Sequence, residues 1–133
     1  FGIVKSIKKV NINARSNFLV GFRDESWESI LQTKEFAKNL FAEGLDQVGF
    51  SIPVSFPGTQ DFEFEMKKSD VKKDFDDNLL KYTDFMHPLL PPLFPTKVSG
   101  ERLVSACREF WQEINDKKYI KKTEERLLSV SGY

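Results

Sequence analysis

The stretch RSNFLVGFRDESWESI, residues 15–30, carries the pattern from which we predict the fold. Apolar residues alternate within Asn17–Arg23, which is the period-two pattern of a half-buried strand. Asp24 follows where a helix N-cap belongs, and apolar residues then recur at spacings of three and four from Trp27 onward. The stretch therefore predicts a strand that leads into a helix, and Gly44 is the expected stop of that helix.

Strand-like patterns flank this stretch on both sides. Residues Gly2–Val10 are rich in β-branched side chains, and we expect them to pair with Asn17–Arg23 as a β-hairpin. Apolar residues also alternate in the segments 50–56 and 61–66. Pro53 lies inside the first of these two, which favours an edge strand or a bulge. These neighbours predict a mostly antiparallel sheet.

The remaining segments are predicted to be helical, apart from one rich in proline. Helical spacing appears from about Ser69 to Tyr82, in Gly100–Ile114 and in Lys117–Leu128. Four prolines among residues 87–95 indicate a stiff, extended connector. The predicted fold class is α+β: a small, mostly antiparallel sheet with helices packed on one face, plus a C-terminal helical extension. The predicted division is an α+β sheet domain (residues 1–86), a connector (87–98) and the helical extension (99–133).

Composition excludes several kinds of site. The 133 residues contain one cysteine and one histidine, which is too few for a zinc site and allows no intrachain disulfide. We therefore expect no metal and no cofactor. Apolar runs are shorter than the ~18 residues that a membrane span needs. These features favour an intracellular protein, cytoplasmic or nuclear, that does not contact a membrane.

The charge is balanced in total but uneven along the chain. The sequence has 20 basic and 20 acidic residues, and residues 1–23 contain five basic residues and no acid. Basic side chains on a strand pair contact phosphates without reading base sequence. The predicted nucleic-acid-binding residues are Lys5, Lys8, Lys9, Arg15 and Arg23.

Residues 2–56 resemble the second half of an RNA-recognition motif. FGIVKSIKKV (1–10) is similar to the opening of the motif's second strand, RSNFLVGF (15–22) to its RNP1 strand, and GFSIPVSFP (49–57) to its closing strand. The resemblance implies a domain that binds single-stranded RNA. Asn17 and Leu19 stand where the motif has aromatic residues that stack on bases, which leaves phosphate contact as the main interaction.

The sequence leaves three functional readings open. The first is a non-catalytic binding domain, associated with RNA or a ribonucleoprotein through the basic hairpin. The second is a protein-interaction or scaffolding domain whose partner binds the aromatic C-terminal helices, with Phe110, Trp111 and Tyr119. The third is an enzyme with a cleft that holds His87 or a carboxylate pair. We predict no catalytic residues and no enzymatic activity, and the expected partners are single-stranded RNA and another protein.

Overall fold

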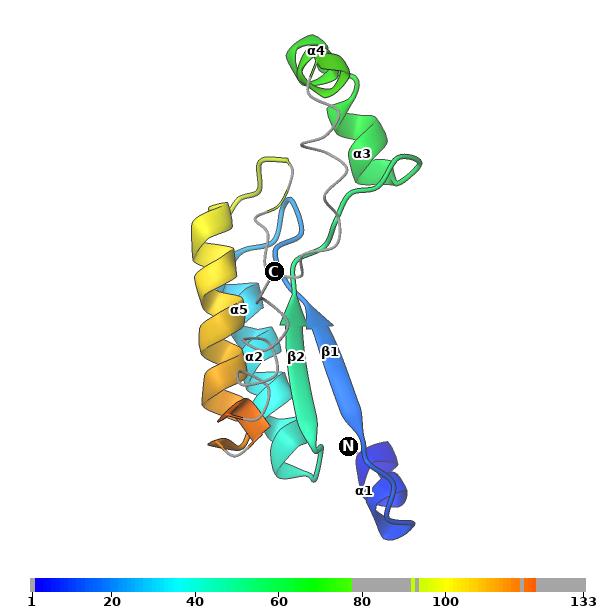
Figure 1. Cartoon of the computed structure of the whole chain (residues 1–133), viewed down its shortest axis with the longest axis vertical. Coiled ribbons are helices and arrows are strands. Elements are labelled where there is room, and N and C mark those ends of the chain that lie inside the picture. Colours follow the sequence, from blue (N-terminus) through cyan, green and yellow to red (C-terminus); the bar gives the residue numbers. More distant parts are fainter. Residues whose placement is uncertain (1, 78–91, 93, 118, 122–133) are drawn as a thin grey trace, which may run out of the picture.

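The computed structural model describes residues 2–77, 92, 94–117 and 119–121. Its elements, labelled in Figure 1, are α1 (Gly2–Lys9), β1 (Arg15–Leu19), α2 (Trp27–Ala42), β2 (Gln47–Ser51), α3 (Gln60–Glu65), α4 (Ser69–Asp77) and α5 (Gly100–Ile114). Several predicted features lie outside the described residues. They are the helix end at Tyr82, the residue His87, most of the proline connector and most of the segment 117–128.

Within the described residues the sheet consists of two parallel strands, so the prediction of a mostly antiparallel sheet is wrong. β1 pairs with β2 in a register that runs from Arg15 opposite Gln47 to Leu19 opposite Ser51. The 16-residue helix α2 lies between the two strands in sequence and returns the chain to the amino end of the sheet. Such a crossover produces a parallel pair, and β1–α2–β2 is a βαβ unit.

The expected hairpin is absent from the described residues because Gly2–Lys9 is a helix and not a strand. Val4 is buried and Ile7 packs against the core, at a helical spacing of three residues. Two ion pairs hold α1 against the end of α2 and the start of β2. The Lys5 Nζ lies 2.8 Å from the Glu43 carboxylate, and the Lys8 Nζ lies 2.9 Å from the Asp46 carboxylate.

The expected strand at residues 61–66 is also a helix, α3. The hydroxyl of Thr59 caps it by accepting a hydrogen bond from the Phe62 backbone N–H. Phe62 is buried, whereas Phe64, two residues later, is exposed. The alternation of Phe62 and Phe64 that suggested a strand therefore arises from one core residue and one surface residue.

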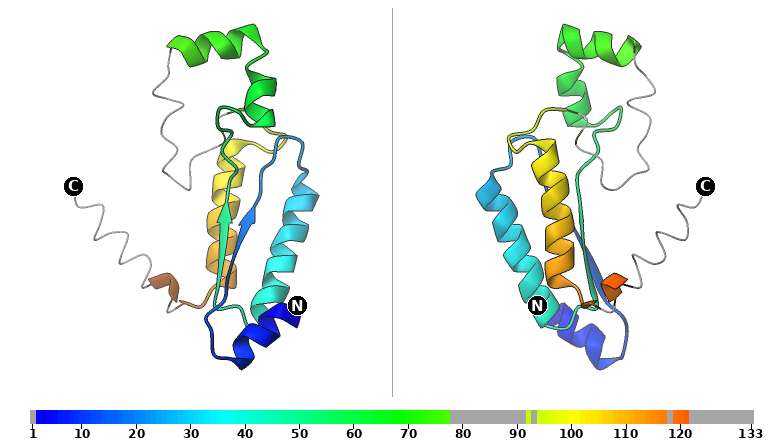
Figure 2. Two further views of the ribbon diagram at one scale, coloured as in Figure 1. Left: turned by 90° about the vertical axis from the view of Figure 1, so that its right-hand side faces the viewer. Right: turned by 60° about the vertical axis from the view of Figure 1, so that its left-hand side comes forward.

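Helices α2 and α5 pack against the same face of the sheet, as the two views of Figure 2 show. The ring of Phe50 on β2 stacks on that of Phe18 on β1, with centroids 5.6 Å apart, and meets the ring of Phe110 on α5 at 5.4 Å. Buried residues from α2, β2 and α5 form one hydrophobic cluster. On the opposite face Arg15, Asn17 and Leu19 are exposed.

No helix among the described residues combines the length and the apolar character that crossing a membrane requires.

Candidate functional site at the carboxyl ends of the strands

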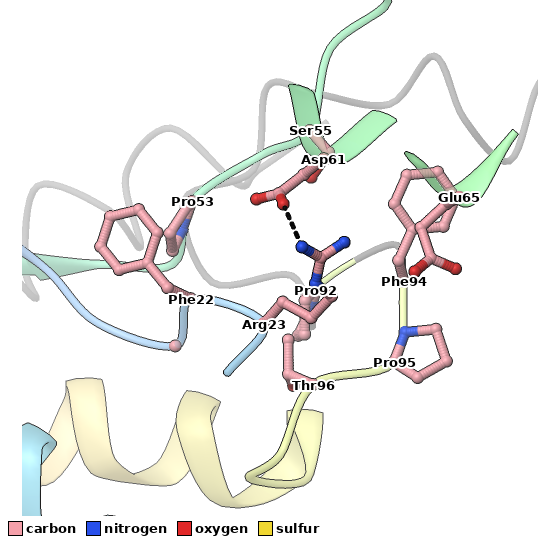
Figure 3. Close-up of a pocket in the computed structure, with 11 residues that line it drawn as sticks. Phe22, Arg23, Pro53, Ser55, Asp61, Glu65, Pro92, Phe94, Pro95 and Thr96 are labelled. Atoms are coloured by element: carbon pink, nitrogen blue, oxygen red, sulfur yellow. Dashed lines mark ion pairs between the residues drawn. The ribbon is translucent and has the colours of Figure 1, made fainter. Parts of the chain in front are cut away.

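A pocket lies where the two parallel strands end. It is lined by the loop after β1 (Gly21–Arg23), the segment after β2 (Pro53 and Ser55), two carboxylates of α3 (Asp61 and Glu65), and the segment that precedes α5 (Pro92 and Phe94–Thr96), as Figure 3 shows. In parallel α/β folds, ligands bind outside the carboxyl ends of the strands, where the loops converge. We therefore treat this pocket as the candidate site.

The loop after β1 has a fixed backbone conformation. Gly21 has a φ of +94°, which side-chain-bearing residues rarely adopt. The backbone N–H groups of Gly21 and Phe22 both donate to the Glu25 carboxylate, at 2.7 and 3.2 Å. The Ser29 hydroxyl donates to the other oxygen of the same carboxylate at 3.2 Å. Glu25 thus ties the loop to the first turn of α2.

Arg23 extends from this loop into the pocket. Its Nη2 lies 3.4 Å from the Asp61 carboxylate, the dashed contact in Figure 3, and its guanidinium carbon lies 4.1 Å from the centre of the Phe64 ring. Its Nη1 is buried and has no hydrogen-bond partner among the described residues. Because buried donors are almost always paired, this nitrogen is available to an acceptor that binds in the pocket.

A buried carboxylate forms the other side of the pocket. Glu65 is only 2% exposed, and its side chain accepts a hydrogen bond of 2.7 Å from the Lys68 ammonium. The segment before α5 is tied to the loop after β1, since the Lys97 N–H donates to the Arg23 carbonyl at 2.9 Å. The site therefore combines a guanidinium with two carboxylates on supports from three parts of the chain.

The enclosed space is small. It measures ≈ 20 Å³, about the room that one water molecule needs. An open depression of ≈ 430 Å³ adjoins it and shares Phe22, Arg23 and Asp61 with it. The described residues therefore form a small cavity beside an open depression, and the cavity itself is too small to enclose a substrate.

The five basic residues predicted to bind nucleic acid do not share one strand pair. Lys5, Lys8 and Lys9 belong to α1, which leads to the amino end of β1. Arg15 begins β1, whereas Arg23 follows its other end and lies in the pocket.

Lys8 is engaged within the protein. Its hydrogen bond to Asp46, together with the one that the Ala14 N–H donates, lowers the pKa of the Asp46 carboxyl.

Of the pocket's charged residues, sequence reasoning singled out only Arg23 as a site residue, and for a different role. Glu25, Asp61 and Glu65 were not recognised as parts of one site. The sequence feature that could have identified them is the position of Arg23 and Glu25 between a strand and the helix that follows it.

The described residues contain no group of three or more His, Cys, Asp or Glu side chains that could hold a metal ion. Phe110 is buried in the core, and Trp111 and Tyr119 contact each other with ring centroids 6.2 Å apart.

Comparison with known proteins finds one partial similarity to a methyltransferase. No family model matches the chain, and no solved structure does. Over 61 residues, which are 46% of this chain, the sequence is 38% identical to an uncharacterized methyltransferase of Pyrococcus horikoshii. The match spans only 13% of that protein's length. This similarity contradicts the prediction of a non-catalytic binding domain, whether for RNA or for scaffolding, and the prediction that the protein is not an enzyme.

Proposed function

We propose that this chain is part of an enzyme that transfers a methyl group, and that its strand-end pocket faces the reaction site. The observation that carries the proposal is the 38% identity to a methyltransferase over 61 residues. The parallel β1–α2–β2 unit adds support, because sheets of this kind place their ligand sites at the carboxyl ends of the strands.

Arg23 is the residue that we propose to contact a ligand. Its free Nη1 suits an anionic oxygen, as found in a carboxylate or a phosphate. Asp61 holds the guanidinium through its Nη2, and the Phe64 ring lies against its face. Glu25 acts as a positioning residue, because its hydrogen bonds fix the loop from which Arg23 extends.

The role proposed for this pocket is alignment. Methyl transfer requires the donor carbon and the acceptor atom to be held in line at close range, and such positioning supplies a large part of the rate enhancement. A guanidinium that binds an anionic group of the donor or acceptor can hold that molecule in line without touching the reacting atoms. We also propose that the protein acts inside the cell, because its single cysteine is free and buried.

The test is a methyl-transfer assay with the protein expressed together with any flanking sequence that its gene encodes. The protein is incubated with S-adenosylmethionine, a common biological methyl donor, carrying tritium in its methyl group, and with a cell extract as the source of acceptors. Three forms are compared: the natural protein, Arg23→Gln, and the control Arg108→Gln, which removes an exposed arginine of α5 outside the pocket.

We expect the natural protein and Arg108→Gln to transfer tritium equally, and Arg23→Gln to transfer about tenfold less or lower still, as for loss of a charge-assisted contact. Transfer no greater than in the blank would refute the methyl-transfer proposal. Equal transfer by all three forms would leave the activity standing but refute the site.

A further inference from the structure

The outer edge of β1 is an unpaired sheet edge in the described part of the chain. The Val20 N–H donates to the Ser51 carbonyl, and the Asp46 N–H donates to the Ala14 carbonyl. The even-numbered residues of this strand therefore direct their backbone groups toward β2. Since these groups alternate along a strand, those of Arg15, Asn17 and Leu19 point away from β2. Figure 1 shows no strand on that side of β1.

The outer edge of β2, in contrast, is protected at Val48. The side-chain amide of Asn115, just after α5, accepts a hydrogen bond from the Val48 N–H and donates one to the Val48 carbonyl, both at 2.9 Å. It also donates to the Trp111 carbonyl at 2.8 Å. One buried side chain thus takes the place of a neighbouring strand at Val48. Among the residues that the structure describes, no comparable protection covers β1, whose five residues contain neither proline nor a bulge.

The face of the sheet opposite the helices is partly open in the described part of the chain. Leu19 is 51% exposed there. Parallel sheets are normally buried on both faces and contain more than two strands, because their pairing alone is weak. The β1–β2 pair therefore has the character of one side of a larger parallel sheet that continues beyond β1.

The position of α1 shows where such a sheet would continue. α1 lies beside the end of α2 and is held there by Lys5 and Lys8, and from Lys9 the chain turns into the amino end of β1, as both views in Figure 2 show. A helix that packs beside the next crossover helix and feeds the amino end of a strand occupies the second position of a βαβ unit.

We propose that the outer edge of β1 pairs with a further parallel strand of the same protein, the strand that precedes α1 in a right-handed βαβ unit. This preceding strand would form hydrogen bonds with the outward backbone N–H and carbonyl groups of Arg15, Asn17 and Leu19 on β1. This inference concerns the architecture and does not depend on the methyl-transfer proposal.

The experiment measures amide hydrogen exchange at single residues by NMR. Two samples are compared: the 133-residue chain, and the protein with all flanking sequence that its gene encodes. The inward amides of Ser16, Phe18 and Val20 serve as internal controls, because β2 already pairs with them. In the complete protein we expect the outward amides of Arg15, Asn17 and Leu19 to exchange at least about 100-fold more slowly than in the 133-residue chain, as paired strand amides do.

Two results would overturn the proposal. One is fast exchange of the three outward amides in the complete protein while the inward ones stay protected. The other is protection already present in the 133-residue chain that disappears on dilution, because this would identify the occupant as a second copy of the chain.

Discussion

Alanine at Gly21, at the start of the pocket loop, would destabilise the fold in two ways: through backbone strain and through a close contact with Leu103. A comparison with alanine at Gly58 separates the two effects. Gly21 and Gly58 have similar positive φ angles, +94° and +90°. Their surroundings differ. A Cβ at Gly21 would lie 2.7 Å from Leu103 Cδ1, whereas a Cβ at Gly58 would meet no atom within 4 Å.

The expected losses follow from these surroundings. Alanine at either position forces a side-chain-bearing residue into a conformation that costs about 1–3 kcal/mol. At Gly21 the methyl group also presses on Leu103, which is fully buried, and overpacking a core adds about 1–3 kcal/mol. We therefore expect Gly21→Ala to reduce the free energy of unfolding by about 2 kcal/mol more than Gly58→Ala.

The assay is urea unfolding of the natural chain and both variants, followed by circular dichroism. With a slope of about 2 kcal/mol per M urea, the midpoint of Gly21→Ala should fall about 1 M below that of Gly58→Ala. Equal midpoints for the two variants would show that Leu103 does not lie against Gly21. They would refute the close packing of the pocket loop on α5.

Three further predictions test the core and its edges. Asn115→Ala leaves the buried N–H and carbonyl of Val48 without partners, so we expect it to lower the free energy of unfolding by about 3 kcal/mol; a urea midpoint equal to that of the natural chain would contradict this. The hydrogen bond from Lys8 lowers the pKa of Asp46 in the folded chain. The ionised Asp46 therefore stabilises the fold fully above the unfolded-state pKa of about 4, and this stabilisation is lost as the pH falls from there through the folded-state pKa. Stability measured from about pH 6 to pH 3 should therefore decline less in Asp46→Asn than in the natural chain, and parallel declines would refute the linkage. Burial raises the pKa of Cys107 to about 11, so iodoacetamide at pH 8 should label this thiol only after urea unfolds the chain, and rapid labelling of the folded chain would contradict its burial.

Local patterns were good guides to part of the fold. The helix predicted at Gly100–Ile114 has those bounds in the structure, and Gly44 follows the last residues of α2 with a φ of +113°. These elements have strong three-and-four spacing and a clear stop. The N-cap of α2 is Ser26 and not Asp24, because the two residues before Ser26 form the turn that Glu25 holds.

The direction of the sheet was mispredicted through a single local error. Val and Ile in Gly2–Lys9 favour a strand by propensity, yet contacts of Val4 and Ile7 with the core make this segment a helix. A strand at Gly2–Val10 implies a hairpin with Asn17–Arg23, and hence an antiparallel pair. The length of the helix between the two true strands already indicated a parallel pair.

The site was harder to predict than the fold because its members are distant in sequence. Arg23 and Asp61 lie 3.4 Å apart across nearly forty intervening positions, and no spacing rule joins them. Only the parallel arrangement of β1 and β2, which brings their carboxyl ends together, explains why the loop after one strand meets the helix after the other.

Whether a methyl donor binds at the carboxyl ends of the strands can be measured by NMR. The ¹⁵N-labelled protein, expressed with any flanking sequence that its gene encodes, is titrated with S-adenosylmethionine. We expect shifts in the amide signals of Gly21, Arg23 and Ser55 at the carboxyl ends of the strands, and none at Arg15 or Gln47 at the amino ends. Shifts confined to the amino ends, or no shifts at any of these residues, would contradict the proposed site.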